Sequence, residues 1–308
     1  MTSQTQVLYV GSWGRSGSTL LDLILGQIPG CVSVGELRYL WERGLAERQL
    51  CGCGVPVPDC PFWSAVLEEA SSRGEPIKPA EVLALWKRVD GLARIPSLMA
   101  PWHGPRHQED LRVFREVLGR VYGAVAKVSG ASTVVDSSKY AAYGLLIAGV
   151  PGLDLRLLHL VRDSRAVAYS WLRRKLMPEV TAEVRYMPVK GPWRSATYWE
   201  LENLALELLR RSSARWARIR YDDLTTEPQS ALGAALAALG INGDLDFLRE
   251  RVLHLGLNHT VAGNPMRFRR GELAIEPDLE WRSRLAAGPR RVVTALTWPL
   301  LARYGFPL

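Results

Sequence analysis

The chain has 308 residues, of which 47% are hydrophobic and 23% charged, and it contains four cysteines. This composition excludes a disordered chain, a collagen-like chain and a small secreted scaffold held together by disulfides. Lysine and arginine outnumber aspartate and glutamate by 39 to 31, a net charge of +8, which favours an anionic partner such as a nucleotide, a nucleic acid or an acidic lipid.

No targeting segment is visible in the sequence. The first residues carry no cationic region ahead of an apolar run, and the apolar runs elsewhere fall short of the roughly 20 residues that a spanning helix needs. We therefore expect a cytoplasmic protein with no transmembrane segment, in which residues 1–308 form a single domain.

The predicted elements alternate along the chain. Residues 7–12 form a short β-branched and aromatic run typical of a buried parallel strand, and residues 18–27 have helical spacing. Three more strand-like runs each precede a helical pattern; the strands are 132–138, 155–163 and 216–224, and the helices are 141–149, 165–175 and 228–240. This alternation predicts an α/β fold with a P-loop-like parallel sheet flanked by helices on both faces.

Three segments stand apart from the alternation. Residues 51–130 are rich in proline, tryptophan and helical periodicity, which predicts a helical insertion or cap within the domain. Residues 176–192 predict a loop, and residues 254–278 predict a long irregular segment.

The turn after the first strand reads GSWGRSGSTLL (11–21). A glycine-rich loop that opens a helix presents backbone N–H groups to an anion and adds the helix dipole. Ser16, Ser18 and Thr19 contribute hydroxyl groups. A tight turn with a capping serine is the alternative, but the position after the first strand of an α/β sheet favours ligand binding.

The same turn departs from the nucleotide-hydrolase pattern G-x-x-x-x-G-K-[ST], because Gly17 is followed by Ser18 instead of lysine. Its one cation is Arg15, and no later strand ends in an obvious Mg²⁺ site. A phosphoryl donor usually needs Mg²⁺ to neutralise its charge. A sulfuryl group carries a single negative charge, so the turn favours a metal-independent transfer.

A second motif, LVRDSRAVAYSW (160–171), places Arg162 at a strand's end and Ser170 eight positions later, where both can face one phosphate. Surface charge beside a helix start is the alternative. Together with GRSGSTLL, this motif resembles the sulfotransferases that use 3′-phosphoadenosine 5′-phosphosulfate (PAPS). In that family the first turn binds the 5′-phosphosulfate, and the arginine and serine hold the 3′-phosphate.

Two further segments resemble the same family. In residues 267–285, a basic loop with glycine precedes an acidic-tryptophan-basic element, and the matching residues are Arg269, Arg270, Gly271, Trp281 and Arg282. The resemblance implies that this loop closes over the nucleotide and contacts the 3′-phosphate. Tyr221 matches a tyrosine near adenine, although a core aromatic is an equal alternative.

The resemblance implies PAPS as donor, adenosine 3′,5′-bisphosphate (PAP) as product and no required metal. The cofactor-binding residues it implies are Gly14, Arg15, Ser16, Gly17, Ser18, Thr19, Arg162, Ser170, Tyr221, Arg269, Arg270 and Gly271. The insertion would then form an acceptor-side cap. Its tryptophans would line an apolar pocket for a small-molecule, lipid or glycoside hydroxyl, with core packing as the alternative; they are Trp41, Trp63, Trp86 and Trp102.

The attacking hydroxyl must lose a proton, so a general base is expected. Many relatives use a histidine after the third strand, but residues 134–140 contain none. The resemblance favours Glu36 as the base, with His259 as the runner-up. Arg15 and Lys139 are the candidate cations for the transition state, and Asp136 with Ser138 could position Lys139 or the acceptor.

Three cysteines cluster in CGCGVPVPDC (51–60), and no histidine is near them in sequence. Zinc binding, with Cys31 as a fourth ligand, a local disulfide and free thiols all remain open for Cys51, Cys53 and Cys60. Two other functions also remain as alternatives: a P-loop kinase-like phosphotransferase and a non-catalytic nucleic-acid binder. The missing lysine argues against the first. Against the second, basic runs such as residues 172–175 are explained by a bisphosphate site, and no nucleic-acid module is present.

Overall fold

The structure, a computed structural model, describes residues 4–100, 104–174, 176–178, 180, 184–213 and 215–308. Its strands are β1 (Thr5–Gly11), β2 (Cys31–Gly35), β3 (Thr133–Lys139), β4 (Leu153–Val161), β5 (Arg215–Arg220), β6 (Val252–Leu255) and β7 (Gly271–Ala274). Its α-helices are α1 (Ser18–Leu25), α2 (Pro61–Ser72), α3 (Pro79–Val89), α4 (Ile95–Met99), α5 (Pro105–Ser129), α6 (Ala141–Ala148), α7 (Ser164–Leu172), α8 (Pro192–Leu209), α9 (Tyr221–Thr226), α10 (Pro228–Leu239), α11 (Trp281–Arg284) and α12 (Ala287–Arg303).

A five-stranded parallel sheet with the order β2-β3-β1-β4-β5 lies at the centre, so the predicted α/β fold is confirmed. Strand β2, which is short and contains serine and glycine, was not predicted from the sequence. Strand β5 is shorter than the predicted 216–224, because the chain turns into α9 at Tyr221. Asp222 and Asp223 in the first turn of α9 favour a helix start there.

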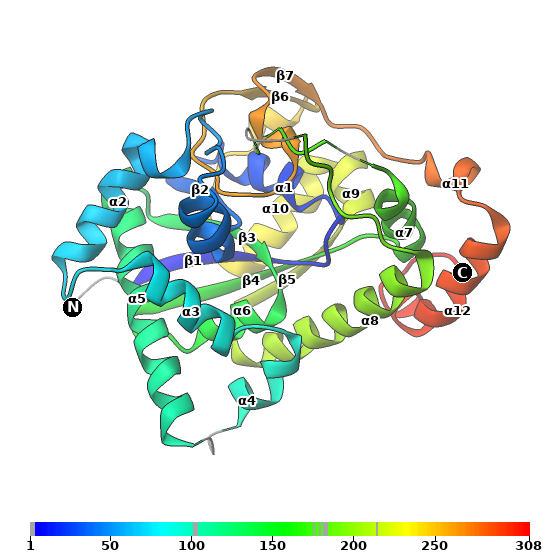
Figure 1. The fold of residues 1–308 in the computed structure, drawn as a ribbon. Helices are drawn as coiled ribbons and strands as arrows, with labels where there is room; N and C mark the ends of the chain where they lie inside the picture. Colours follow the sequence, from blue (N-terminus) through cyan, green and yellow to red (C-terminus); the bar gives the residue numbers. More distant parts are fainter. Residues whose placement is uncertain (1–3, 101–103, 175, 179, 181–183, 214) are drawn as a thin grey trace.

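Helices cover both faces of the sheet (Figure 1). Successive side chains of a strand point to opposite faces, and those of the buried strands are apolar on both faces, so each face packs against helices. In β1, Val7 and Tyr9 join a core with α5, α6 and part of α8. Leu8 and Val10 point to the other face and join a core with α1, α9 and α10. This two-sided burial is what the apolar strand runs predicted.

The insertion is helical, as expected, and comprises α2 to α5. It packs on the sheet face that carries Val7 and Tyr9, and Trp41, Trp63 and Trp86 are buried in the core. These tryptophans therefore pack instead of lining an open pocket. Trp102 lies outside the described residues. No helix within the described ranges is both long and apolar enough to cross a membrane.

The segment predicted to be irregular contains an antiparallel hairpin of β6 and β7. In the chain segment that connects β6 to β7, Val261 forms a parallel bridge with Gly35 and so extends the five-stranded sheet beyond β2. Val261 also accepts a hydrogen bond from the backbone N–H of Glu36 at 2.7 Å. The late segment is thereby fixed at the edge of the sheet where the strands end.

Candidate active site

The carboxyl ends of the five parallel strands each carry a predicted site residue. In strand order along the chain these are Arg15 after β1, Glu36 after β2, Lys139 ending β3, Arg162 after β4 and Tyr221 after β5. Ligands bind at this edge of open parallel sheets. All five residues line one cavity of about 330 Å³.

The turn after β1 brings the N-terminus of α1 to this cavity. Gly17 has a φ of +95°, and a Cβ there would lie 2.3 Å from the ring of Tyr221, so only glycine fits. The helix has no side-chain cap, which leaves the N–H groups of its first turn for a ligand. Gly17, Ser18 and Thr19 all line the cavity. The turn therefore opens a helix toward the cavity, and the sequence predicts anion binding at this turn.

Arg15 is held in the same turn by a left-handed backbone with φ of 72°. Its guanidinium lies 5.0 Å from the Trp171 ring centroid, and its two terminal nitrogens are buried without a hydrogen-bond partner among the described residues. Burial lowers the pKa of Arg15 below its usual range. A buried cation without partners is stabilised by a bound anion. Ser16, by contrast, is buried and lies outside the cavity lining.

A second cation is at the turn between β4 and α7. The Arg162 guanidinium lies 4.3 Å from the Tyr221 ring centroid, donates to the Arg15 carbonyl at 3.2 Å and pairs with Asp278 at 2.8 Å. Partial burial raises the pKa of Asp278 and the hydrogen bond from Arg162 lowers it, with the net result that the pKa of Asp278 lies below its ordinary value. Ser170 lines the same cavity from α7. The two residues of the predicted pair, Arg162 and Ser170, therefore line the same cavity.

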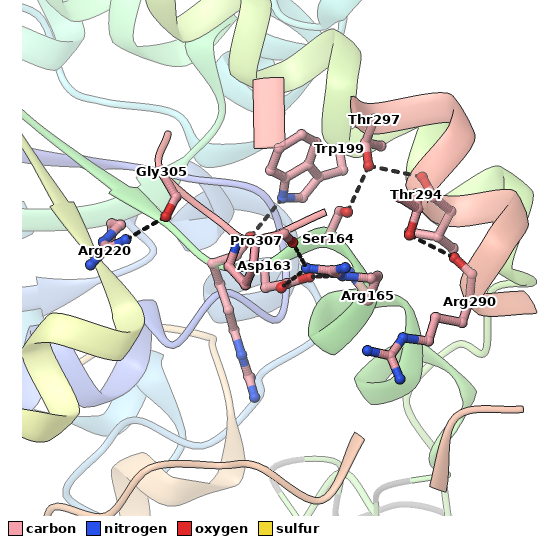
Figure 2. A network of polar contacts seen from close by, with 12 residues as sticks. Asp163, Ser164, Arg165, Trp199, Arg220, Arg290, Thr294, Thr297, Gly305 and Pro307 are labelled. Atoms are coloured by element: carbon pink, nitrogen blue, oxygen red, sulfur yellow. Dashed lines mark hydrogen bonds and ion pairs between the residues drawn. The ribbon is translucent and has the colours of Figure 1, made fainter. Parts of the chain in front are cut away.

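The backbone of this turn is anchored from behind. Trp199 donates to the Arg162 carbonyl at 3.0 Å, and Asp163 caps α7 by accepting from the Arg165 N–H at 2.8 Å. The Arg165 side chain also pairs with Asp163 at 2.7 Å and donates to the Pro307 carbonyl (Figure 2). Asp163 is thus paired with Arg165 on both its carboxylate oxygens.

Glu36 and Lys139 meet across the cavity floor. The Lys139 ammonium donates directly to a Glu36 carboxylate oxygen, and both side chains are largely buried. Lys139 has a positive φ of 76°, a backbone conformation that costs free energy in a residue other than glycine. The arrangement is a buried ion pair that lines the cavity.

Asp136 and Ser138 hold this pair in place instead of facing the cavity. Asp136 accepts from the Tyr122 hydroxyl at 2.5 Å and from the Ser138 N–H at 2.7 Å. The Ser138 hydroxyl in turn accepts from the Arg38 N–H at 2.9 Å, two residues after Glu36. Burial raises the pKa of Asp136 to about 6. Both residues therefore act on Glu36 and Lys139 by positioning the backbone, as the sequence suggested for Lys139.

The opposite wall comes from segments that sequence reasoning did not assign to the site. Met177, Met187, Pro188 and Lys190 come from the predicted 176–192 loop. Its described residues before Pro192, where α8 begins, lie outside helices and strands apart from one isolated bridge. Tyr39, Arg43 and Tyr140 are further lining residues, from the first half of the chain, that the sequence did not predict. No described residue of 51–130 contributes, so the acceptor side is walled by other segments than the expected cap.

Lys190 is the most unusual of these additions. Its ammonium lies 4.4 Å from the Trp13 ring centroid and 4.0 Å from that of Trp171. Burial, followed by the positive charges of Arg194 and Arg15, lowers the pKa of Lys190 to about 8. Five cations line the cavity against two carboxylates, so the described lining favours an anionic ligand.

Several predicted residues lie elsewhere. Arg269, Arg270 and Gly271 are exposed at the start of β7 and do not line the cavity; Arg270 instead donates to the Gly52 carbonyl. From the late segment, the cavity receives Gly263, Asn264, Met266 and Asp278.

The tryptophan of the predicted acidic-tryptophan-basic element, Trp281, is part of the core. Trp281 is buried against α7, with the Arg165 guanidinium 5.2 Å from its ring centroid, and Arg282 is exposed. His259, the runner-up base, lies outside the cavity lining and contacts the cysteine cluster. These placements do not support nucleotide contacts by Arg269 and Arg270 or proton transfer by His259.

Comparison with known proteins identifies the class. The sequence model described as "Sulfotransferase family" matches residues 8–244, so the chain belongs to the sulfotransferase family. No curated protein gives a significant match.

Solved structures agree with this assignment at the level of the fold. The sulfotransferase domain from the curacin biosynthetic pathway has a TM-score of 0.52 and 17% identity, covering 100% of this chain and 99% of that one. The sulfotransferase domain from the Synechococcus PCC 7002 olefin synthase has a TM-score of 0.53 and 19% identity, covering 100% and 97%.

Proposed function

We propose that this protein transfers the sulfuryl group of PAPS to the hydroxyl group of a small-molecule, lipid or glycoside acceptor and releases PAP. One observation carries the proposal: two separate turns, each with an arginine, face one cavity at the carboxyl edge of the sheet. A nucleotide with phosphate groups at both ends matches that arrangement. Membership of the sulfotransferase family supports the reaction class.

The chain's own residues account for donor binding. The N–H groups of the first turn of α1, with Ser18 and Thr19, would hold the 5′-phosphate. Arg162 and Ser170 would hold the 3′-phosphate, because a guanidinium forms paired, charge-assisted hydrogen bonds with phosphate oxygens. Tyr221 lies between these two groups, beside Gly17 and under the Arg162 guanidinium.

PAPS, when bound, supplies the sulfuryl group. Arg15 would stabilise negative charge on the transferring group, since its terminal nitrogens are buried and have no other partner among the described residues. Arg15 cannot act as a general acid, because a guanidinium stays protonated. Glu36 would accept the proton of the attacking hydroxyl, while Lys139 moves from Glu36 toward the leaving phosphate. No residue in this scheme requires a metal ion.

The acceptor side of the cavity is apolar with a cationic rim. Met177, Met187 and Pro188 provide apolar surface, and Tyr39 and Tyr140 provide aromatic surface near Glu36. Such a lining favours an acceptor with a hydrophobic body and a single reactive hydroxyl group. A long polyanionic glycan fits this surface poorly.

Calorimetric titration and a transfer assay test the proposal. PAP should bind at least about tenfold more tightly than AMP, since AMP lacks the 3′-phosphate assigned to Arg162. Label from sulfur-labelled PAPS should appear on an alcohol or phenol from an acceptor panel, with equal release of PAP and no added metal. Tighter binding of Mg²⁺·ATP than of PAP would overturn the proposal and favour a kinase.

A further inference from the structure

The cysteines of the 51–60 segment meet a histidine from a distant part of the chain. His259 is 199 residues beyond Cys60 in sequence, yet its Nδ1 lies 3.3 Å from the Cys60 Sγ and 3.8 Å from the Cys51 Sγ. The Cys53 Sγ lies 3.7 Å from the Cys60 Sγ. All four ligand atoms lie within 4.8 Å of one another, outside the lining of the active-site cavity.

These separations match a tetrahedral zinc site. Zinc binds sulfur at about 2.3 Å and nitrogen at about 2.0–2.1 Å, which places neighbouring sulfurs about 3.8 Å apart and sulfur about 3.5 Å from nitrogen. The Cys53–Cys60 and Cys60–His259 distances agree with these values within a few tenths of an ångström. Three thiolates with one imidazole form a common structural zinc set, and soft sulfur donors exclude Mg²⁺ or Ca²⁺.

The surroundings orient the histidine as a ligand requires. The Phe62 ring stacks on the imidazole with centroids 4.9 Å apart, and Trp63 donates to the His259 carbonyl at 2.8 Å. Cys51 and Cys60 are buried, and Cys51 begins a tight turn in which its N–H donates to the Val55 carbonyl at 2.7 Å. A ligand set that is already oriented loses little conformational entropy when the metal binds.

We propose that Cys51, Cys53, Cys60 and His259 bind one Zn²⁺ ion as a closed structural site. On binding, the three thiols release their protons to solvent and the neutral imidazole coordinates through Nδ1. With four protein ligands the ion has no open position, so it does not take part in the transfer reaction.

The zinc site would connect the start of the insertion to the late segment, which accepts a backbone hydrogen bond from Glu36. Gly52 donates to the Thr260 carbonyl at 2.9 Å, and the next residue, Val261, accepts from the Glu36 N–H at 2.7 Å. The ligand His259 is therefore only two residues before Val261, which contacts the backbone of the proposed base Glu36. It would tie two segments that the sheet alone does not hold together.

Metal analysis of the purified full chain provides the first test. We expect about one zinc per chain by mass spectrometry after dialysis in metal-free buffer. Replacement by Co²⁺ should give the intense d–d absorption of a tetrahedral site and a thiolate-to-cobalt charge-transfer band. Both readouts are independent of sulfotransferase activity, so the zinc site and the proposed function can fail separately.

Variants assign the ligands. Cys53→Ser and Cys60→Ser should each reduce zinc content by more than about tenfold after dialysis. His259→Cys keeps four ligands and should retain zinc with a shifted cobalt spectrum, which tests ligation even if other variants fold poorly. Cys31→Ser, the fourth cysteine of the chain, lies outside the cluster and is the matched control that should keep full zinc content.

Two results would overturn the proposal. A thiol count of two in the denatured, unreduced, chelator-treated protein would reveal a disulfide within the cluster. A count of four with no metal bound, before or after incubation with Zn²⁺, would establish free thiols. Four thiols together with about one zinc per chain, lost in Cys60→Ser and kept in Cys31→Ser, supports it.

Discussion

The two halves of the active-site cavity are built differently. The turns after β1 and β4 follow directly from strands buried on both faces, and each turn carries an arginine that lines the cavity. The late segment between β6 and β7 is positioned by contacts with residues far away in sequence, such as the hydrogen bond from Glu36 to Val261. The first half is a product of local chain geometry, and the second depends on tertiary contacts.

This difference separates two kinds of functional residue. Arg15 and Arg162 lie directly after β1 and β4, so the buried strands bring both arginines to the cavity. Glu36 needs Val261, Ser138 and Lys139 together to face the cavity. We therefore expect substitutions in the two halves to separate binding from turnover.

The largest effect should follow the change Glu36→Gln. The amide cannot accept the acceptor's proton, so turnover should fall by about 10²- to 10⁴-fold. PAP affinity, which depends on the other half of the cavity, should change by less than about threefold. Steady-state kinetics and calorimetry on the same preparation measure the two quantities. A variant that keeps more than a tenth of the turnover would remove Glu36 from its role.

Next in size is the contrast between Arg162→Ala and Arg269→Ala. A charge-assisted hydrogen bond contributes about 1.5–3 kcal/mol, so Arg162→Ala should weaken PAP by about 10- to 100-fold while AMP changes far less. Arg269→Ala should leave PAP affinity unchanged, since Arg269 is exposed and outside the cavity lining. Comparable losses in both variants would show that the late loop closes over the nucleotide.

The third prediction concerns pH. Lys190 has a pKa lowered to about 8 in the free protein, and a bound anion favours its charged form. Below pH 8 the charge is already present, whereas above it each binding event must take up a proton. PAP affinity should therefore fall about tenfold between pH 7 and pH 9. Calorimetry of Lys190→Met should give a flat profile over this range, and an equally steep one would show that another group titrates.

The smallest effect should come from Asp278→Asn. The carboxylate occupies the Arg162 guanidinium, which a 3′-phosphate must also use. Because partly exposed ion pairs contribute about 0.2–1 kcal/mol, removing this competitor should tighten PAP by about two- to fivefold. The affinity for AMP is the internal control and should stay within error. Weaker PAP binding would mean that Asp278 contacts the ligand itself.

The sequence predicted the parts of the site that local rules control. The spacing of Arg162 and Ser170 was enough to predict that both face the same cavity, because the end of β4 and the helix α7 fix the positions of both residues. Arg269 and Arg270 matched a motif in letters, yet the β6–β7 hairpin directs Arg270 toward Gly52. Lys190, Asp278 and the approach of His259 to Cys60 gave no local signal, because distant segments create them.

The anchoring of the Arg162 turn has a practical consequence. The Pro307 carbonyl accepts from Arg165, and the Gly305 carbonyl accepts at 2.8 Å from Arg220, the residue before Tyr221 (Figure 2). The last residues of the sequence thus fasten two of the turns that face the cavity. Removing residues 305–308 should loosen these two turns and leave the rest of the fold intact. An affinity handle or fusion partner is better attached ahead of β1, where it does not disturb these contacts.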